Sequence, residues 1–233
     1  MNIPYGELMK YRGSIEIKPI YDYPVFQHEY AIIQSMIMRN TNILDFGCGT
    51  GKVYNEALLP NGYSGLYVGI DNDPTLKTRV NFPLYDSVDE IIENYGLREF
   101  DMIFMLNALE HMKVEESYEI LTKLNPYIDA NILIMTPNSK CFDYMFVDPQ
   151  HTTFYSHEFL YGLLKHLGFD GIQIWRGKGI YPQREAEFKN NNGLIHFKEM
   201  NEFQRKVCLS MSLDWYGNLL VIGERNYEED SSN

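Results

Sequence analysis

A short apolar run that ends in alternating glycines is the feature of this sequence that most constrains its fold. The run Asn42-Ile43-Leu44-Asp45-Phe46 leads into Gly47, Gly49 and Gly51. Glycine lets a turn after a strand bend without a Cβ and lets a ligand lie close to the backbone. A helix that starts near Lys52 would point its unpaired N–H groups at the same turn. The pattern therefore predicts a strand, a ligand-binding turn and a helix, in that order.

An acidic residue ends the second predicted strand, twenty positions after Gly51. At this place Asp71 could accept hydrogen bonds from both hydroxyls of a ribose. The G-x-G-x-G spacing differs from the G-x-G-x-x-G of dinucleotide-binding folds. In addition, the Asp45 carboxylate would repel a pyrophosphate but suits a cationic ligand with a free amine. The sequence thus predicts a nucleoside-containing cofactor and disfavours a nicotinamide dehydrogenase.

The segment Leu44–Gly51 closely resembles motif I of the class I S-adenosylmethionine-dependent methyltransferases, and Asp71 matches the ribose-binding acid of that family. The resemblance implies an enzyme whose cofactor is S-adenosyl-L-methionine. It also implies a set of cofactor-binding residues along the first two strands: Asp45, Gly47, Cys48, Gly49, Gly51, Asp71 and Asn72.

Strand-like and helix-like segments alternate along the chain. Strands are expected at 43–46, 66–70, 82–85, 102–106, 132–136, 172–175 and 219–222, and helices at 53–58, 88–95, 115–124 and 157–167. Continuous apolar strands separated by helices predict an α/β fold with a doubly wound, mostly parallel sheet that is covered on both faces. The family resemblance implies seven strands, of which the last, within 218–225, is antiparallel.

We expect a single domain over residues 1–227. Residues 1–24 are rich in Tyr and Pro and read as an irregular N-terminal arm, and 28–39 has helical spacing, so that 1–40 forms an arm and a helix. By analogy with the family, the insertion 177–216 is a substrate lid. The acidic tail 228–233 is expected to fray.

Charge and composition exclude several classes of partner. The formal net charge of −12 disfavours broad contact with nucleic acid or anionic membranes. No apolar run approaches the ~20 residues of a membrane span, and the N-terminus lacks a signal-peptide core. Three cysteines without a C-x-x-C pattern fit reduced thiols in a cytoplasmic protein.

Polar residues follow the third predicted strand. The family commonly places a polar contact to the adenine amine there, which makes Asp86 a candidate. Asp86 could instead be the N-cap of the helix that starts at Val88. Ser87 could replace Asp86 as the contact, so the two residues remain alternatives.

The segment after the fourth predicted strand resembles the part of the same family that lies near the transferred methyl group, which points to Asn107. On a helical turn Asn107, Glu110 and His111 would share a face. An E-x-x-E-H pattern holds a divalent metal in ubiquinone-pathway O-methyltransferases and in small-RNA 2′-O-methyltransferases. Here Asn107 replaces the first glutamate and removes one anionic ligand, so no metal is expected. His111 is then a candidate general base, and the alternative is that Glu110 and His111 only brace the turn.

A further candidate lies in Asp148-Pro-Gln-His151, which is followed by Phe154-Tyr-Ser156 and a helix ending at Gly168-Phe169. This signature resembles methyltransferases that act on small molecules or glycans, where His151 would face the substrate. His151 is therefore a second candidate base, with a structural hydrogen bond as the alternative. Ser156 is expected to cap the helix.

Taken together, these residues predict methyl transfer from S-adenosyl-L-methionine to oxygen or nitrogen of a small-molecule or sugar-like acceptor. Two alternatives remain at this point. One is a metal-assisted RNA 2′-O-methyltransferase, which the net charge and Asn107 disfavour. The other is a cofactor-binding protein without catalysis, because a glycine loop reports binding and not turnover.

Overall fold

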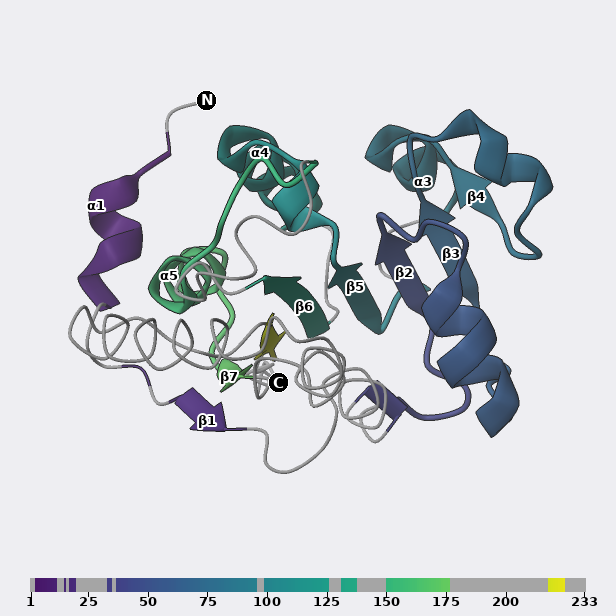
Figure 1. Ribbon diagram of the computed structural model, residues 1–233, viewed down its shortest axis with the longest axis horizontal. Coiled ribbons are helices and arrows are strands. Elements are labelled where there is room, and N and C mark those ends of the chain that lie inside the picture. The colour runs from purple at the N-terminus through teal and green to yellow at the C-terminus, as the bar shows by residue number, and fades with distance from the viewer. Residues whose placement is uncertain are drawn as a thin grey trace, which may run out of the picture.

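Parallel strands joined by helices build the centre of the molecule (Figure 1). The computed structural model describes residues 3–11, 15, 17–19, 33–34, 37–95, 99–125, 131–137, 150–176 and 218–224. Their strands form one sheet in the order β1-β7-β8-β6-β5-β2-β3-β4. The strands are β1 (Ile17–Pro19), β2 (Ile43–Phe46), β3 (Tyr67–Ile70), β4 (Leu84–Tyr85), β5 (Met102–Leu106), β6 (Asn131–Pro137), β7 (Gln173–Arg176) and β8 (Asn218–Gly223).

Seven of these strands, β2 to β8, confirm the predicted doubly wound sheet. Strand β8 runs antiparallel to both of its neighbours, β6 and β7, and the other pairings are parallel. The eighth strand, β1, extends the edge of the sheet beside β7 and was not predicted. The expectation of an irregular N-terminal arm was therefore wrong for this segment, because pairing with an edge strand gives three residues an extended conformation that their own sequence does not signal.

The central strands are predominantly apolar because helices cover both faces of the sheet. In β5 every residue is buried, and successive side chains enter opposite cores. Ile103 and Met105 belong to the core that also contains buried residues of α3 (Val88–Asn94), α4 (Val114–Leu124) and α5 (His157–His166). Met102 and Phe104 pack on the other side against the helical segment that contains η2 (Tyr54–Leu58) and η3 (Leu59–Asn61).

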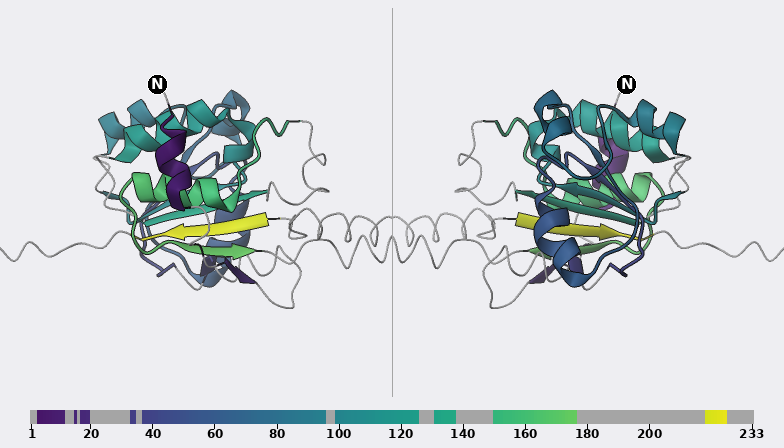
Figure 2. Two further views of the ribbon diagram at one scale, coloured as in Figure 1. Left: turned by 90° about the vertical axis from the view of Figure 1, so that its left-hand side faces the viewer. Right: turned by 90° about the vertical axis from the view of Figure 1, so that its right-hand side faces the viewer.

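The N-terminal segment also forms helical structure, which the sequence did not predict. Helix α1 (Tyr5–Leu8) continues as the 3-10 turn η1 (Met9–Tyr11) and lies beside α5 (Figure 2). The contact is so close that a Cβ added at Gly162 of α5 would lie 1.8 Å from the Leu8 carbonyl oxygen. A glycine inside a helix is therefore explained here by the packing of two helices.

Most of the predicted helices and strands begin and end within one or two residues of the observed bounds. The predicted helix 53–58 is mostly a π-helical turn, η2, which continues into η3. Ser156 caps α5 as predicted, since its hydroxyl accepts from the Phe159 N–H at 3.2 Å. Ser87 and not Asp86 caps α3, so the cap reading of Asp86 was wrong.

Some predictions fall on residues that the structure does not describe: most of the helix 28–39, the substrate lid 177–216 and the acidic tail 228–233. Among the described helices the longest, α4, has 11 residues. A bilayer needs about 20, so none of them could cross a membrane.

Candidate active site

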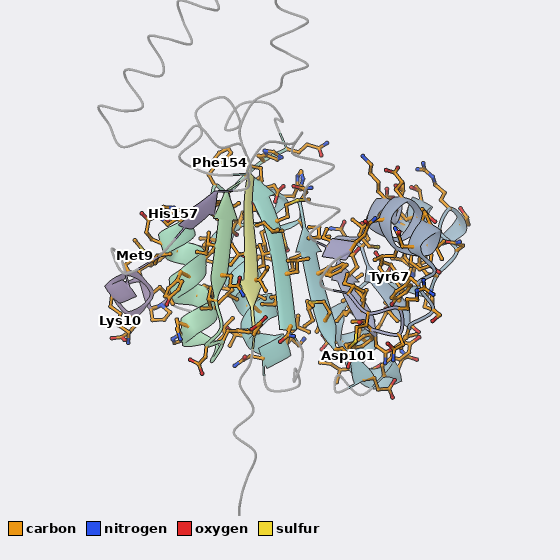
Figure 3. The ribbon with its side chains drawn as sticks, turned by 90° about the horizontal axis from the view of Figure 1, so that it is seen from below. Met9, Lys10, Tyr67, Asp101, Phe154 and His157 are labelled. Atoms are coloured by element: carbon orange, nitrogen blue, oxygen red, sulfur yellow. The ribbon has the colours of Figure 1, made fainter. Side chains whose placement is uncertain are left out.

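The order of the strands places a crevice at the carboxyl edge of the sheet. After β2 the chain moves outward through β3 and β4, then returns to form β5 on the opposite side of β2. In open α/β sheets ligands bind where the strand order reverses in this way, outside the carboxyl ends. Phe154 marks this edge in Figure 3, and Asp101, just before β5, marks the opposite one.

A cavity of about 790 Å³ lies at this reversal point. Its size falls within the range of small-molecule sites. Seven of the residues singled out from the sequence line it: Gly47, Asp71, Asn72, Asp86, Ser87, Asn107 and His111. Residues from the ends of four neighbouring strands thus meet at one place.

The glycine loop after β2 has the backbone that only glycine adopts easily. Gly47, Gly49 and Gly51 have φ angles of 73°, 51° and 69°. At Gly47 a Cβ would come within 2.5 Å of the Ala108 Cβ, so the loop also packs tightly against the segment after β5. Gly47 donates its N–H to the Ile70 carbonyl at 2.8 Å, which holds the loop to the end of β3.

Asp71 connects the two cofactor motifs. One carboxylate oxygen accepts from the Gly49 N–H at 2.9 Å, and the other accepts from the Asp73 N–H at 3.0 Å. These bonds fix the orientation of a carboxylate that also lines the cavity. An oriented carboxylate with free lone pairs suits two adjacent hydroxyls.

Asp45 lies beneath the loop and does not line the cavity. It is 3% exposed and accepts a hydrogen bond from the Tyr67 hydroxyl. Burial, with a smaller contribution from the charge of Asp71, raises the pKa of Asp45 to about 7, although the hydrogen bond from Tyr67 acts in the opposite direction. A role of Asp45 toward a cationic amine stays a prediction, and it would act from behind the loop.

Cys48, Gly49 and Gly51 likewise lie outside the cavity lining. Cys48 is buried, and burial raises the pKa of its thiol, so the thiol stays protonated and unreactive. Gly51 lies against the ring of Phe82. These residues shape the loop from its inner side.

The Asp86 side chain does not cap α3, because Ser87 does. The Asp86 carboxylate forms an ion pair with Lys77 at 2.6 Å, and both side chains are about half exposed. Asp86 and Ser87 both line the cavity. A contact to an adenine amine stays a prediction for each.

The turn after β5 differs from the expected helical face. Asn107 has a φ of 54°, in the left-handed region that asparagine tolerates better than most residues, and its N–H donates to the Met135 carbonyl at 2.7 Å. The 3-10 turn η6 (Leu109–His111) begins only after it. The prediction that Asn107, Glu110 and His111 share one helical turn was therefore wrong, although Asn107 and His111 both line the cavity.

His151 comes from a distant part of the chain and lies beside His111. The two imidazole rings have centroids 5.0 Å apart. The next two residues, Thr152 and Thr153, donate their N–H groups to the Glu110 carbonyl at 2.8 and 3.1 Å. His151 does not itself line the cavity, but its neighbour Gln150 does.

Helix α4 and the turn before it supply a wall that was missed from the sequence. Three residues of α4, Glu116, Ile120 and Lys123, are spaced by four and three positions and so share one helical face, and Met112 lines the cavity from the turn before the helix. That periodicity was the available signal. The other lining residues not singled out are Phe46, Ile70, Val88, Asp89, Ala108 and Gln150.

Comparison with known proteins agrees with this geometry. Residues 29–174 match a family model described as a methyltransferase domain. A probable cobalt-precorrin-6B C(15)-methyltransferase (decarboxylating) from Saccharolobus solfataricus is 30% identical over an alignment of 122 residues, and the match covers 47% of this chain. The match spans 61% of that relative's length.

Solved structures show the same fold at low sequence identity. A SAM-dependent methyltransferase from Archaeoglobus fulgidus is 19% identical with a TM-score of 0.58, covering 88% of this chain and all of that one. The small RNA methyltransferase HEN1 is 17% identical with a TM-score of 0.57, covering 91% of this chain and 27% of that one.

The matched family model covers more than half of the chain, so the chain belongs to the methyltransferase domain family. It is a class I S-adenosylmethionine-dependent methyltransferase, with the fold that the glycine loop and strand order define. Membership in this family favours an enzyme over the alternative of a cofactor-binding protein without catalysis.

Proposed function

We propose that the enzyme transfers the methyl group of S-adenosylmethionine to an oxygen or nitrogen of a small-molecule or sugar-like acceptor. One observation carries the proposal: His111 and Gln150, beside His151, line the same cavity as the predicted cofactor residues Asp71 and Asn107. A cofactor side and an acceptor side thus share one space.

The residues present fit this cofactor. A nucleoside needs an acceptor for its ribose hydroxyls, which Asp71 supplies in a fixed orientation. It needs close approach to the backbone, which the positive φ of Gly47 permits. When bound, S-adenosylmethionine supplies an electrophilic methyl carbon on a sulfonium.

The protein's own contribution is to position the two reactants. In this proposal Asp71 and the loop hold the nucleoside, Asp86 or Ser87 contacts the adenine, and Asn107 lies near the methyl group. Positioning of this kind contributes about 7–11 kcal/mol in favourable systems. The imidazoles of His111 and His151 are the groups placed to assist removal of a proton from an acceptor hydroxyl.

An RNA acceptor is the second candidate, because HEN1 shares the fold. The net charge of −12 opposes it. So does the cavity lining, where Asp71, Asp86, Asp89 and Glu116 stand against Lys123 as the only Lys or Arg among the described lining residues. Phosphate contacts depend on lysine and arginine, so the small-molecule acceptor is favoured.

Calorimetry and turnover test the proposal separately. The protein is expected to bind S-adenosylmethionine and S-adenosylhomocysteine, and to release S-adenosylhomocysteine when hydroxyl- or amine-bearing small molecules are supplied. A His111→Ala, His151→Ala double variant should keep cofactor affinity and lose turnover with a hydroxyl acceptor. Unimpaired turnover would remove both histidines from the reaction, and failure to bind the cofactor would refute the proposal.

A further inference from the structure

Three potential metal ligands converge at the acceptor side of the cavity. One nitrogen each of His111 and His151 and one carboxylate oxygen of Glu110 all lie within 4.8 Å of one another. His111 is exposed, His151 half-buried and Glu110 only 1% exposed. A buried carboxylate beside two imidazoles offers an anionic oxygen and two neutral nitrogens to a cation, which is a donor set that divalent metals bind.

The two chain segments that carry these groups are locked together. The Glu110 carbonyl accepts the N–H groups of Thr152 and Thr153, and the Thr153 hydroxyl donates to the Met112 carbonyl at 2.6 Å. His151 is thereby held next to the turn that contains Glu110 and His111. The relative placement of the ligands follows from the backbone and does not depend on flexible side chains alone.

The carboxylate itself is oriented by a neighbour. The Thr136 hydroxyl, from β6, donates to Glu110 Oε2 at 3.1 Å, and Thr136 is fully buried. Metal-binding carboxylates are held in this way by an outer hydrogen bond. Ligand atoms about 2.1 Å from a tetrahedral ion lie roughly 3.4 Å apart, so side-chain shifts of little more than an ångström would bring these three atoms, which lie within 4.8 Å of one another, to that spacing.

The donor set selects the kind of ion. Imidazole nitrogen favours zinc, iron, nickel or copper, whereas magnesium prefers oxygen ligands. Two histidines and one glutamate with further positions open are the ligands of a catalytic zinc-type site. We propose that Glu110, His111 and His151 bind a zinc-like divalent transition-metal ion whose open positions face the cavity.

This inference rests on the proposed function for its role and names the acceptor as an oxygen nucleophile. A hydroxyl on such an ion ionises near neutral pH, as zinc-bound water does with a pKa of about 7. The proton leaves to solvent, and the oxygen lone pair forms the bond to the methyl carbon. The carbon–sulfur bonding pair returns to sulfur, giving a methyl ether and S-adenosylhomocysteine.

The position of Asn107 agrees with a site of three ligands. From the sequence, loss of a glutamate at 107 argued against any metal. In the structure Asn107 lies before the η6 turn in a left-handed conformation and is not part of the cluster. The third ligand is His151, forty positions after His111 in the sequence.

Cobalt(II) tests the site without any acceptor. Added to the untagged, metal-free protein, Co²⁺ should give a saturable visible absorption band at one equivalent, which Zn²⁺ abolishes and equimolar Mg²⁺ does not. His111→Asn, an exposed change that spares the core, and His151→Asn should each weaken binding by more than about 100-fold. Thr136→Val should weaken it about 10- to 100-fold.

His166→Asn is the matched control. His166 is exposed, bonds to the Tyr118 hydroxyl and ends α5, which starts at the carboxyl edge, so this change should leave Co²⁺ affinity unchanged. No saturable band, undiminished binding in His111→Asn, or displacement by Mg²⁺ as readily as by Zn²⁺ would overturn the inference. Calorimetry with S-adenosylmethionine on the same samples separates the two proposals: cofactor binding without Co²⁺ binding refutes only the metal site.

Discussion

The Asp71 carboxylate holds the glycine loop by accepting the Gly49 backbone N–H at 2.9 Å, across the gap between the ends of β2 and β3. The residue expected to bind the cofactor ribose therefore also fixes the turn on which the cofactor would lie. A change at Asp71 is therefore expected to affect both cofactor binding and the conformation of the glycine loop.

Two substitutions of Asp71 should separate these roles. Asp71→Ala removes the ribose acceptor and both backbone bonds, so cofactor affinity and stability should both fall. Asp71→Asn keeps a carbonyl oxygen for Gly49 and loses the charge, so stability should be largely retained. Because hydrogen bonds to charged groups contribute about 1.5–3 kcal/mol, calorimetry should show a Kd roughly 10- to 100-fold higher in both variants. Equal affinity of Asp71→Asn and wild type would contradict the ribose role.

Gly47→Ala should lower the free energy of unfolding by more than the strained backbone conformation at this position would lower it alone. The added Cβ meets Ala108 at 2.5 Å and the φ of 73° is strained for alanine, so we expect a loss of about 2–4 kcal/mol in the free energy of unfolding.

Gly168→Ala is the matched control for Gly47→Ala. Gly168 has a φ of 87°, and a Cβ added at this position would have nothing within 4 Å, so only the strain of about 1 kcal/mol applies. Chemical denaturation measures both variants, and equal losses would show that the Ala108 contact is unimportant.

Asp86 and Ser87 should show opposite effects. Asp86→Ala breaks only an exposed ion pair with Lys77, so stability should stay close to wild type while cofactor affinity falls. Ser87→Ala removes the α3 cap and should cost about 1 kcal/mol of stability. Calorimetry and denaturation on both variants check this, and unchanged affinity in Asp86→Ala would exclude an adenine contact.

Because of Asp45, the free energy of unfolding should fall as the pH rises from about 4 to 7. Its folded-state pKa is raised to about 7, chiefly by burial, so the native state binds the proton more tightly than the unfolded chain. The resulting loss is at most about 1.4 kcal/mol per pH unit within that window, and it levels off above pH 7. Asp45→Asn can still accept from Tyr67 and should lack this dependence. Parallel pH profiles of the two proteins in urea would contradict the assignment.

The strand pattern and the glycine loop could be read from the sequence because they depend on local chemistry. β5 is a continuous apolar run and β2 is apolar except for Asp45, as is expected of strands that are covered on both faces. The turn at Gly47 requires a conformation that glycine alone adopts cheaply. Asp71 follows from its position at the end of the next strand.

Other features depend on contacts between segments that are far apart in the sequence. β1 is extended because β7 offers an edge, and Gly162 is a glycine because Leu8 packs against it. The sequence predicts that Asp45 acts toward a cationic ligand, and only the tertiary structure shows that its carboxylate is buried under the loop beside Tyr67. Burial and long-range contact are not encoded in any short window of sequence.

The sequence by itself predicted the fold, which the structure confirms, and the residues proposed for the cofactor side of the site, since both predictions come from residues near one another in the chain. Only the tertiary structure decided the acceptor side. His151 meets Glu110 and His111 because Thr152 and Thr153 bond to the Glu110 carbonyl, across about forty residues. A site assembled from two distant segments exists only once the chain has closed that loop, so no local pattern could specify its geometry.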